Sequence, residues 1–270
     1  MVALTSFTSV FWTELLKAYR SRVPMVTTLG FMAFPVVGGL FMFIMKDPER
    51  AKAMGLVGTK AQLLSGGAAD WQSYFDFLSM GTVGAGAIFF AFIIAWIFGR
   101  EFSDHTAKEL LALPIRRSTI VLAKFALSAL WIMALSALLF VVSLGVGAAL
   151  ALPGGSAELA ASSFRNLMAA AFLTLLTTPL VAWFASAGRG YLAPLGWAFG
   201  TLGMSQIAGV LGWADRFPWA VPGAFSMMFS VMYGKDTQAL GLHSYVLVVL
   251  TCILGVAATV VFWRSADQAK

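Results

Sequence analysis

Residues 78–118, LSMGTVGAGAIFFAFIIAWIFGREFSDHTAKELLALPIRRS, join a long apolar run to a short charged segment. The apolar part, 78–98, has no charged side chain. It is long enough to cross a bilayer as a helix, because a helix rises about 1.5 Å per residue and the hydrocarbon layer is roughly 30 Å thick. Another apolar run begins soon after residue 118, so the charged segment is expected to connect two membrane spans.

The composition of the whole chain supports this interpretation. Hydrophobic residues make up 60% of the 270 positions and charged residues only 11%, and the mean hydropathy is +0.85. A soluble domain of this length could not bury that much apolar surface. The sequence therefore predicts an all-α integral membrane protein that forms a single domain over residues 1–270.

Six apolar runs are long enough to be transmembrane helices, and the ranges are about 24–45, 78–98, 121–150, 167–187, 191–212 and 243–263. None of them contains Asp, Glu or Arg. Lys124 lies one turn inside the third run, where its ammonium group is expected to reach back to the interface. Pro35 and Pro179 are expected to kink their helices.

Residues 5–20 precede the first span and have the pattern of an amphipathic helix. Phe7, Phe11, Leu15 and Ala18 recur at helical spacing, while Glu14 lies on another face. We expect this helix to lie along the membrane interface; a cytosolic tail is the alternative.

Basic residues set the expected orientation. If both termini are cytoplasmic, eleven of the 18 Lys and Arg residues lie on the inner side, in the shorter loops. Because cytoplasmic loops carry the excess of Lys and Arg, both termini are predicted to be cytoplasmic, in the cell membrane. The net charge of +6 is thereby explained without nucleic acid.

The spans lack the ionisable residues that usually mark ion or proton pathways. A proton-coupled secondary transporter is therefore disfavoured, and no ion-selectivity motif or zinc-protease motif is present. The chain also lacks a P-loop, so it is not expected to be an enzyme or to bind ATP itself. Any transport would need energy from another subunit.

Residues 100–113 fit a short helix in which one face carries Glu101, Asp104, His105 and Lys108. Pro114 ends this helix. Glu101, Asp104 and His105 could converge on a metal, but no second cluster completes a ligand set, and no metal site is predicted. A solvated connecting turn is one interpretation. The sharper one is a docking element that transmits the movement of a cytoplasmic partner into the membrane.

The segment resembles the corresponding part of type-2 ABC exporter permeases, particularly the bacitracin-resistance-like branch. The residues that carry the resemblance are Arg100-Glu101, Asp104-His105-Thr106, Leu110-Leu111, Pro114, Arg116-Arg117 and Lys124. The overall plan of an interfacial helix, six spans and a Pro- and aromatic-rich segment before the last span is also similar.

The resemblance implies that Arg100, Glu101, Asp104, His105, Thr106 and Lys108 contact an ABC ATP-binding subunit, present in two copies, which binds ATP and Mg. It also implies a dimer with a second permease copy or a related permease. A hydrophobic or amphiphilic cargo, such as an antibiotic or peptide, would cross between them.

Two further features concern the expected membrane domain. Residues 213–234 are aromatic but broken by prolines, so they suit re-entrant or interfacial helices at the outer exit; the residues concerned are Trp213, Phe217, Pro218, Trp219, Pro222 and Phe225. Gly196 and Gly200 form a G-x-x-x-G pattern suited to close helix packing, within the chain or between two chains.

The alternative to an exporter permease is a membrane protein that does not transport, namely an immunity protein, a sensor or a scaffold.

Overall fold

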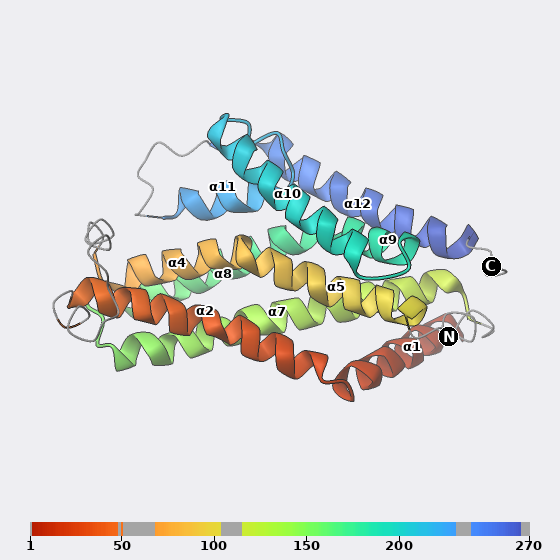
Figure 1. Ribbon diagram of the computed structural model, residues 1–270, viewed down its shortest axis with the longest axis horizontal. Coiled ribbons are helices and arrows are strands. Elements are labelled where there is room, and N and C mark those ends of the chain that lie inside the picture. Colours follow the sequence, from red (N-terminus) through yellow and green to blue (C-terminus); the bar gives the residue numbers. More distant parts are fainter. Residues whose placement is uncertain (1, 48–49, 51–67, 104–114, 231–238, 266–270) are drawn as a thin grey trace.

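The computed structural model describes residues 2–47, 50, 68–103, 115–230 and 239–265. Its regular elements in those ranges are helices that pack into an elongated bundle (Figure 1). They are α1 (Val2–Tyr19), α2 (Val23–Lys46), α4 (Trp71–Val83), α5 (Ala85–Ser103), α7 (Arg117–Ala149), α8 (Ala157–Leu176), α9 (Pro179–Ala187), α10 (Leu192–Val210), α11 (Val221–Met228) and α12 (Leu242–Ser265). The all-helical prediction is confirmed for the described residues.

Five described segments are long and apolar enough to cross a membrane: Val23–Lys46, Trp71–Ser103, Arg117–Ala149, Ala157–Ala187 and Leu242–Ser265. The sixth expected span corresponds to α10, which has 19 residues. This helix is not among the five candidate spans, and it contains several glycines and the polar Ser205 and Gln206. The multi-pass character of the protein is therefore established, whereas the count of six is not.

Two of the five spans are broken near their middles. The second is divided at Gly84, where the backbone leaves helical geometry between α4 and α5. The fourth is divided at Pro179, which begins α9 and has no N–H to continue the hydrogen bonding of α8. Kinks were expected at both prolines; the helix is interrupted before Pro179, whereas Pro35 lies inside the continuous helix α2.

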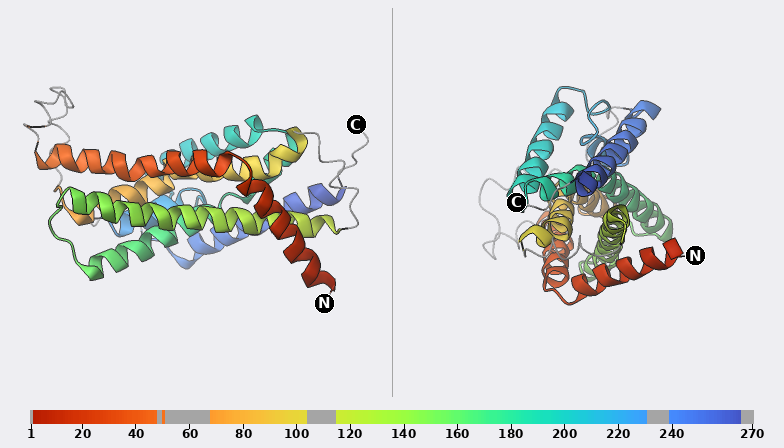
Figure 2. Two further views of the ribbon diagram at one scale, coloured as in Figure 1. Left: turned by 90° about the horizontal axis from the view of Figure 1, so that it is seen from below. Right: turned by 90° about the vertical axis from the view of Figure 1, so that its right-hand side faces the viewer.

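The helix α1 lies apart from the bundle axis and crosses its outside, as the end-on view in Figure 2 shows. Phe7, Phe11 and Leu15 are partly buried against the bundle and Ala18 is buried, so the predicted apolar face is the one that packs. The end of α12 lies at the same end of the bundle as α1 (Figure 1).

Close helix contacts depend on glycines that face bulky neighbours. A Cβ atom at Gly147 of α7 would lie only 2.5 Å from the Trp71 ring carbon Cζ3, and one at Gly39 of α2 would lie 2.5 Å from Val146. At Gly255 of α12 the neighbour is backbone, because a Cβ there would lie 2.7 Å from the Leu180 nitrogen. The α9–α12 contact is thus one of the tightest in the bundle.

The structure corrects one expectation about the second span. The helix begins at Trp71, seven residues before the predicted boundary, because Asp70 caps it by accepting a hydrogen bond from the Ser73 N–H at 2.8 Å. Asp76 therefore lies inside a membrane-spanning segment and is buried. The expectation that the spans lack acidic residues was wrong at this position.

Candidate functional site

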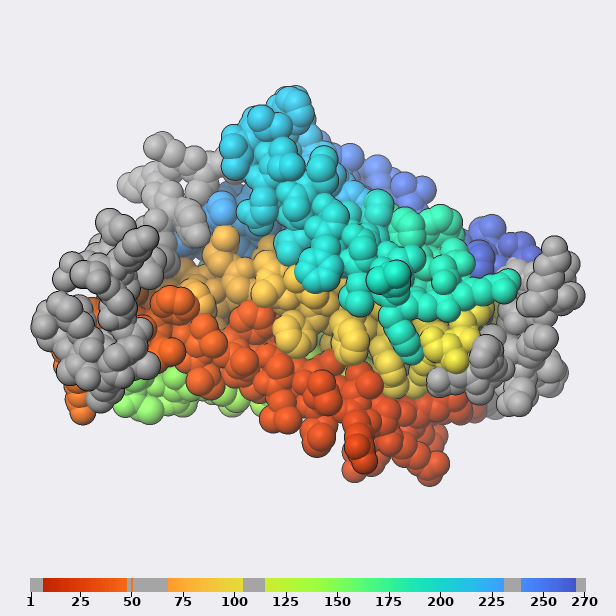
Figure 3. Space-filling model, in the orientation of Figure 1, coloured from red at the N-terminus to blue at the C-terminus, as the bar shows by residue number. Residues whose placement is uncertain are grey.

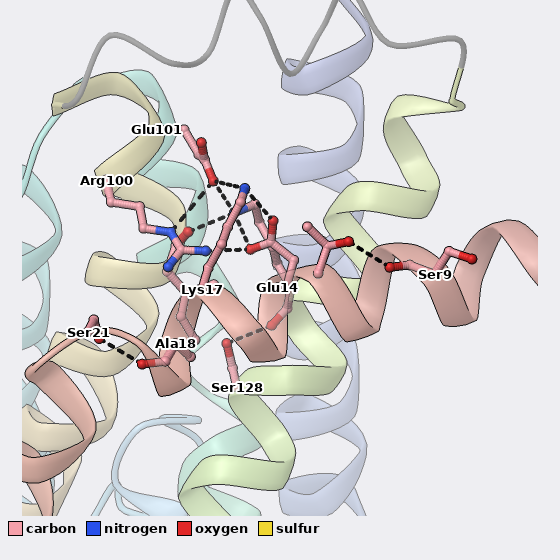
Figure 4. Close-up of polar contacts among 11 residues, drawn as sticks. Ser9, Glu14, Lys17, Ala18, Ser21, Arg100, Glu101 and Ser128 are labelled. Atoms are coloured by element: carbon pink, nitrogen blue, oxygen red, sulfur yellow. Dashed lines mark hydrogen bonds and ion pairs between the residues drawn. The ribbon is translucent and has the colours of Figure 1, made fainter.

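Five charged side chains meet at the end of the bundle where α1 packs against α5 and α7 (Figure 4). We call this group the ionic cluster; its members are Glu14 and Lys17 from α1, Arg100 and Glu101 from α5, and Lys124 from α7. Glu14, Glu101 and Lys124 are 1%, 3% and 0% exposed. Charges buried this deeply are tolerated only when they are paired and hydrogen-bonded.

Lys124 uses all three of its ammonium donors. Its Nζ lies 2.8 Å from Glu14 Oε2, 3.0 Å from Glu101 Oε1 and 3.0 Å from the Ile97 carbonyl oxygen. An ammonium group has three N–H donors, so this lysine is fully satisfied. It joins α1, α5 and α7 at one point.

Arg100 and Lys17 complete the cluster from either side. Arg100 Nη2 donates to Glu14 Oε2 at 2.7 Å, and the guanidinium carbon lies 4.6 Å from the centroid of the Trp96 ring. Lys17 Nζ lies 3.0 Å from Glu14 Oε1 and 3.2 Å from Glu101 Oε1. Lys17 is the most exposed member, with 36% of its side chain accessible, and it forms the outer surface of the cluster.

The electrostatics favour an ionised Glu14. Burial raises the pKa of this carboxyl group, but the positive charges of Lys124, Lys17 and Arg100 and the hydrogen bond from Lys124 outweigh burial. The pKa is therefore held below its ordinary value of 4.5. The carboxylate stays charged at neutral pH and holds α1 against the bundle.

This geometry changes the interpretation of two residues. Glu101 was expected on an exposed docking face, but it lies at the end of α5 with its carboxylate turned into the ionic cluster. Lys124 was expected to reach the interface; it is instead fully buried, because two carboxylates from other helices come to it. Asp104, His105, Thr106 and Lys108 lie outside the described residues, and so does most of the predicted 100–113 helix.

The pairing of Lys124 with Glu14 and Glu101 was not predicted from the sequence. A lysine inside an apolar run signals a need for an opposite charge. Glu14 and Glu101 were among the five acidic residues expected on the same side of the membrane as Lys124, and this shared side was the available signal. No group of three metal-binding side chains occurs within the ranges that the structure describes.

The second feature is a cavity of about 460 Å³ beside the break between α4 and α5. We call it the main cavity; it is lined by Met80, Val83, Gly84, Leu202, Ser205, Gln206, Gly209, Val210, Gly212, Ala214, Trp219, Ala220, Gly223, Ala224 and Met227. Its size falls within the range of ligand pockets, and its lining is mostly apolar with a few polar groups. A smaller extension shares Val83, Leu202 and Trp219 and adds the threonines of the α8–α9 break.

Trp219 is the central residue of the predicted outer segment. Its indole N–H donates to the Thr177 carbonyl oxygen at 3.1 Å, next to the Pro179 break. Phe217 packs against Trp219, with 5.3 Å between the centroids of the two rings. Pro222 lines the extension of the main cavity. The break between α8 and α9 thus helps to fix the wall of the main cavity.

The other residues of the predicted outer segment lie elsewhere. Phe225 packs toward Val221 of α11 and Val248 of α12, and Trp213 is 57% exposed. Neither is among the residues that line the main cavity. Within the described part of this segment, the regular helix is the eight-residue α11.

The predicted packing glycines of α10 have no close neighbour among the residues that the structure describes. A Cβ atom at Gly196, Gly200 or Gly203 would meet nothing within 4 Å. Figure 3 shows α10 on the surface of the bundle beside α5 and near α2. Intramolecular packing, one of the two roles considered for the G-x-x-x-G pattern, does not occur at these glycines in the described chain.

Comparison with known proteins gives two matches. The model of a family described as "ABC-2 family transporter protein" matches residues 10–202, a range that includes the ionic cluster and the start of α10. The bacitracin transport permease protein BCRB of Bacillus licheniformis is 26% identical over 184 residues, covering 67% of this chain and 85% of the relative. No solved structure matches the chain.

Proposed function

Because the chain belongs to the ABC-2 family of transporter membrane proteins, we propose that it is the permease subunit of an ATP-driven exporter. A separate ABC subunit binds ATP and Mg, since this chain has no nucleotide-binding motif. The similarity to a bacitracin transport permease suggests an antibiotic-like or peptide-like amphiphile as cargo.

The observation that carries the proposal is the position of the ionic cluster. It lies at the end of α5, directly before the rest of the predicted 100–113 helix, which the family resemblance implies contacts the ATP-binding subunit. Any force applied to that segment reaches both α5 and α7, because the segment joins these two helices along the chain. Because Glu14 pairs with Lys124 and Arg100, the force also passes to α1.

The proposed cycle uses this connection as a lever. Two ATP-binding subunits approach each other when ATP binds, and they displace residues 104–114 of the two permeases. The displaced end of α5 moves α4 relative to α10 across the break at Gly84, which changes the shape of the main cavity. Cargo that entered the main cavity from the membrane is then released on the outer side.

The remaining parts of the proposal concern assembly. Two permease copies, or one copy and a related permease, form the pathway, with both termini cytoplasmic and α10 as the sixth span. In this arrangement α1 lies along the cytoplasmic interface, and α11 belongs to a re-entrant segment at the exit. The excess of basic residues at the end containing the ionic cluster supports this orientation.

The test is a mild-detergent purification of the chain from its native membrane, with partners identified by mass spectrometry. The proposal predicts a stoichiometric partner that contains a P-loop. Joint replacement of Asp104 and Lys108 by Ala is expected to lose that partner without lowering the thermal unfolding midpoint. Glu158→Ala, on the exposed first turn of α8 at the other end of the bundle, is the control that keeps it.

Glu101→Gln gives a different expected result, because Glu101 is buried. The variant should lower the thermal unfolding midpoint as well as partner recovery. If no ATPase is recovered even after cross-linking, the exporter proposal fails, and the chain is better regarded as a non-transporting sensor, immunity protein or scaffold.

A further inference from the structure

Three polar side chains line the main cavity, and they differ in whether the chain itself already satisfies them. Ser205 Oγ donates to the Leu202 carbonyl oxygen at 2.7 Å, within α10. The Trp219 indole N–H donates to the Thr177 carbonyl oxygen at 3.1 Å. The Gln206 amide, by contrast, forms no hydrogen bond with the residues that the structure describes. Its two N–H donors and its carbonyl acceptor are therefore available to a guest.

The wall of the main cavity carries no ionisable side chain among the fifteen described residues that form it. Asp215 and Arg216 directly follow the lining residue Ala214, but Asp215 Oδ2 already lies 3.0 Å from His243 Nε2 and 3.7 Å from Arg216 Nε. A charged group that entered the main cavity would leave water without gaining an opposite charge, and such a transfer is costly. The main cavity thus favours a guest that is uncharged in the part enclosed.

The main cavity is open beside α10. Val210 is 89% exposed, and Gln206 and Gly209 are also exposed. At the start of α11 and along it, the lining residues Ala220 and Ala224 are buried. This arrangement lets a guest enter beside α10, place its apolar part against α11 and keep a polar group at Gln206.

We propose that the main cavity binds an uncharged segment of an amphiphile and that the Gln206 amide pairs with an amide of that segment. This rests on the proposed export function and narrows its cargo to amphiphiles with an uncharged, amide-bearing segment, of which an acylated peptide is one example. The Gln206 side chain donates an N–H to the guest carbonyl and accepts the guest N–H at its own carbonyl. An alcohol donates and accepts at a single oxygen, so it does not match both groups at once.

The test compares guests that differ only in their polar group. The purified full-length chain is placed in phosphatidylcholine nanodiscs, whose lipid contains no amide, and binding of tritiated dodecanamide is measured at pH 7. Dodecanol, dodecylammonium and dodecyl sulfate have the same alkyl chain and serve as unlabelled competitors. Empty nanodiscs give the concentration of each compound in the lipid. The expected result is saturable binding of dodecanamide, with each competitor at least about tenfold weaker than unlabelled dodecanamide.

Two substitutions at Gln206 test the polar contact. Gln206→Leu removes both hydrogen-bonding groups, so dodecanamide binding should weaken about tenfold and no longer exceed that of dodecanol. Gln206→Glu places a carboxylate at the same position and should reverse the preference, so that this variant binds dodecylammonium more tightly than dodecanamide. Met204→Leu is the control, because Met204 is an exposed residue of α10 that does not line the main cavity. It should bind all four compounds as the unaltered chain does.

A third substitution tests whether the main cavity holds the alkyl chain. Gly209 lines the main cavity, and a Cβ atom there would meet nothing within 4 Å. Gly209→Leu should therefore fold and fill part of the space, which should weaken binding of dodecanamide and dodecanol alike by about tenfold. Gly145→Leu adds the same side chain on α7, away from the main cavity, and should leave binding unchanged.

Several outcomes would overturn the proposal. One is dodecanamide binding that does not saturate, and another is competition by dodecylammonium or dodecyl sulfate as strong as that by dodecanamide. Unchanged dodecanamide binding in either Gln206→Leu or Gly209→Leu would also overturn it. The titration needs neither ATP nor an ATPase. Its failure therefore leaves the recovery of a P-loop partner unaffected, and failure to recover that partner leaves the selectivity of the main cavity measurable.

Discussion

The sequence identified Lys124 as an unusual residue, but it did not predict the role of Lys124. Its position in an apolar run identified it as unusual. Hydropathy describes the residues along one helix, however, and the two carboxylates that satisfy Lys124 come from α1 and α5. Removing one partner of such a buried group costs about 3–5 kcal/mol, because the remaining charges are left uncompensated. This cost makes the ionic cluster a strict constraint on how α1 is placed.

The lowered pKa of Glu14 predicts a specific dependence of stability on pH. A carboxyl group whose pKa is lower in the folded state stabilises the protein fully above its ordinary value of 4.5, and this contribution is lost as the pH falls through the folded-state pKa. Glu14→Gln should therefore be less stable at pH 7 by about 3–5 kcal/mol. It should also lose less further stability on acidification than the unaltered chain.

The measurement is the thermal unfolding midpoint of the purified protein between pH 7 and pH 3. Glu158→Gln, which changes an exposed carboxyl group at the other end of the bundle, should retain the acid sensitivity of the unaltered chain. If Glu14→Gln and the unaltered chain lose stability in parallel below pH 4.5, Glu14 does not have the electrostatic role assigned to it.

Helices were more predictable than residue partnerships. The run lengths placed most of the spans, and Pro179 indicated the α8–α9 break, because both depend on local backbone chemistry. The break at Gly84 and the early start of α4 were not predicted. The early start of α4 depends on Trp71, which fits against Gly147, and on Asp70, which caps the helix before the apolar run begins. A hydropathy average does not contain either contact.

The α9–α12 contact gives a prediction at the scale of elements. Gly255→Ala would place its Cβ atom 2.7 Å from the Leu180 nitrogen and 2.8 Å from the Pro179 carbonyl carbon. Backbone atoms cannot rotate away as a side chain can, so the helices must separate. We expect a loss of about 1–3 kcal/mol in the free energy of unfolding, measured by denaturant unfolding in detergent micelles.

The control for this substitution is Gly145→Ala. Gly145 lies on α7, and a Cβ atom there would meet nothing within 4 Å. The control should be neutral or more stable by up to about 1 kcal/mol, because alanine favours a helix over glycine. Equal destabilisation of the two variants would show that the close approach at Gly255 does not determine the effect.

At the scale of the molecule, the described chain is one helical bundle whose two ends differ. The ionic cluster lies at one end, whereas the main cavity lies beside the break between α4 and α5. The sequence predicted the membrane class and the family resemblance, because composition and a contiguous motif carry both. It did not predict the main cavity, because α4, which forms one wall, lies far along the chain from α10 and α11, which form the others.

The surface of α10 leads to a prediction about assembly. Glycine lowers helix stability by about 1 kcal/mol relative to alanine, so several glycines on one helix face suggest that another backbone approaches there. Gly39 and Gly147 each meet a bulky side chain, and Gly255 meets backbone, whereas a Cβ atom at Gly196, Gly200 or Gly203 would meet nothing within 4 Å among the described residues. The latter three recur at helical spacing on one face of α10. We expect that face to pack against α10 of a second permease copy.

Gly200→Leu tests this assembly without any ATPase. Copies labelled with donor and acceptor dyes are reconstituted together, and energy transfer is measured as lipid is added to dilute them. The leucine side chain holds the two backbones apart, so association should weaken about tenfold, which corresponds to the 1–2 kcal/mol typical of such helix contacts. Gly145→Leu adds the same side chain to an exposed position of α7 and should leave association unchanged. If both variants associate as the unaltered chain does, the open face of α10 contacts lipid, and the pathway must be closed by other helices.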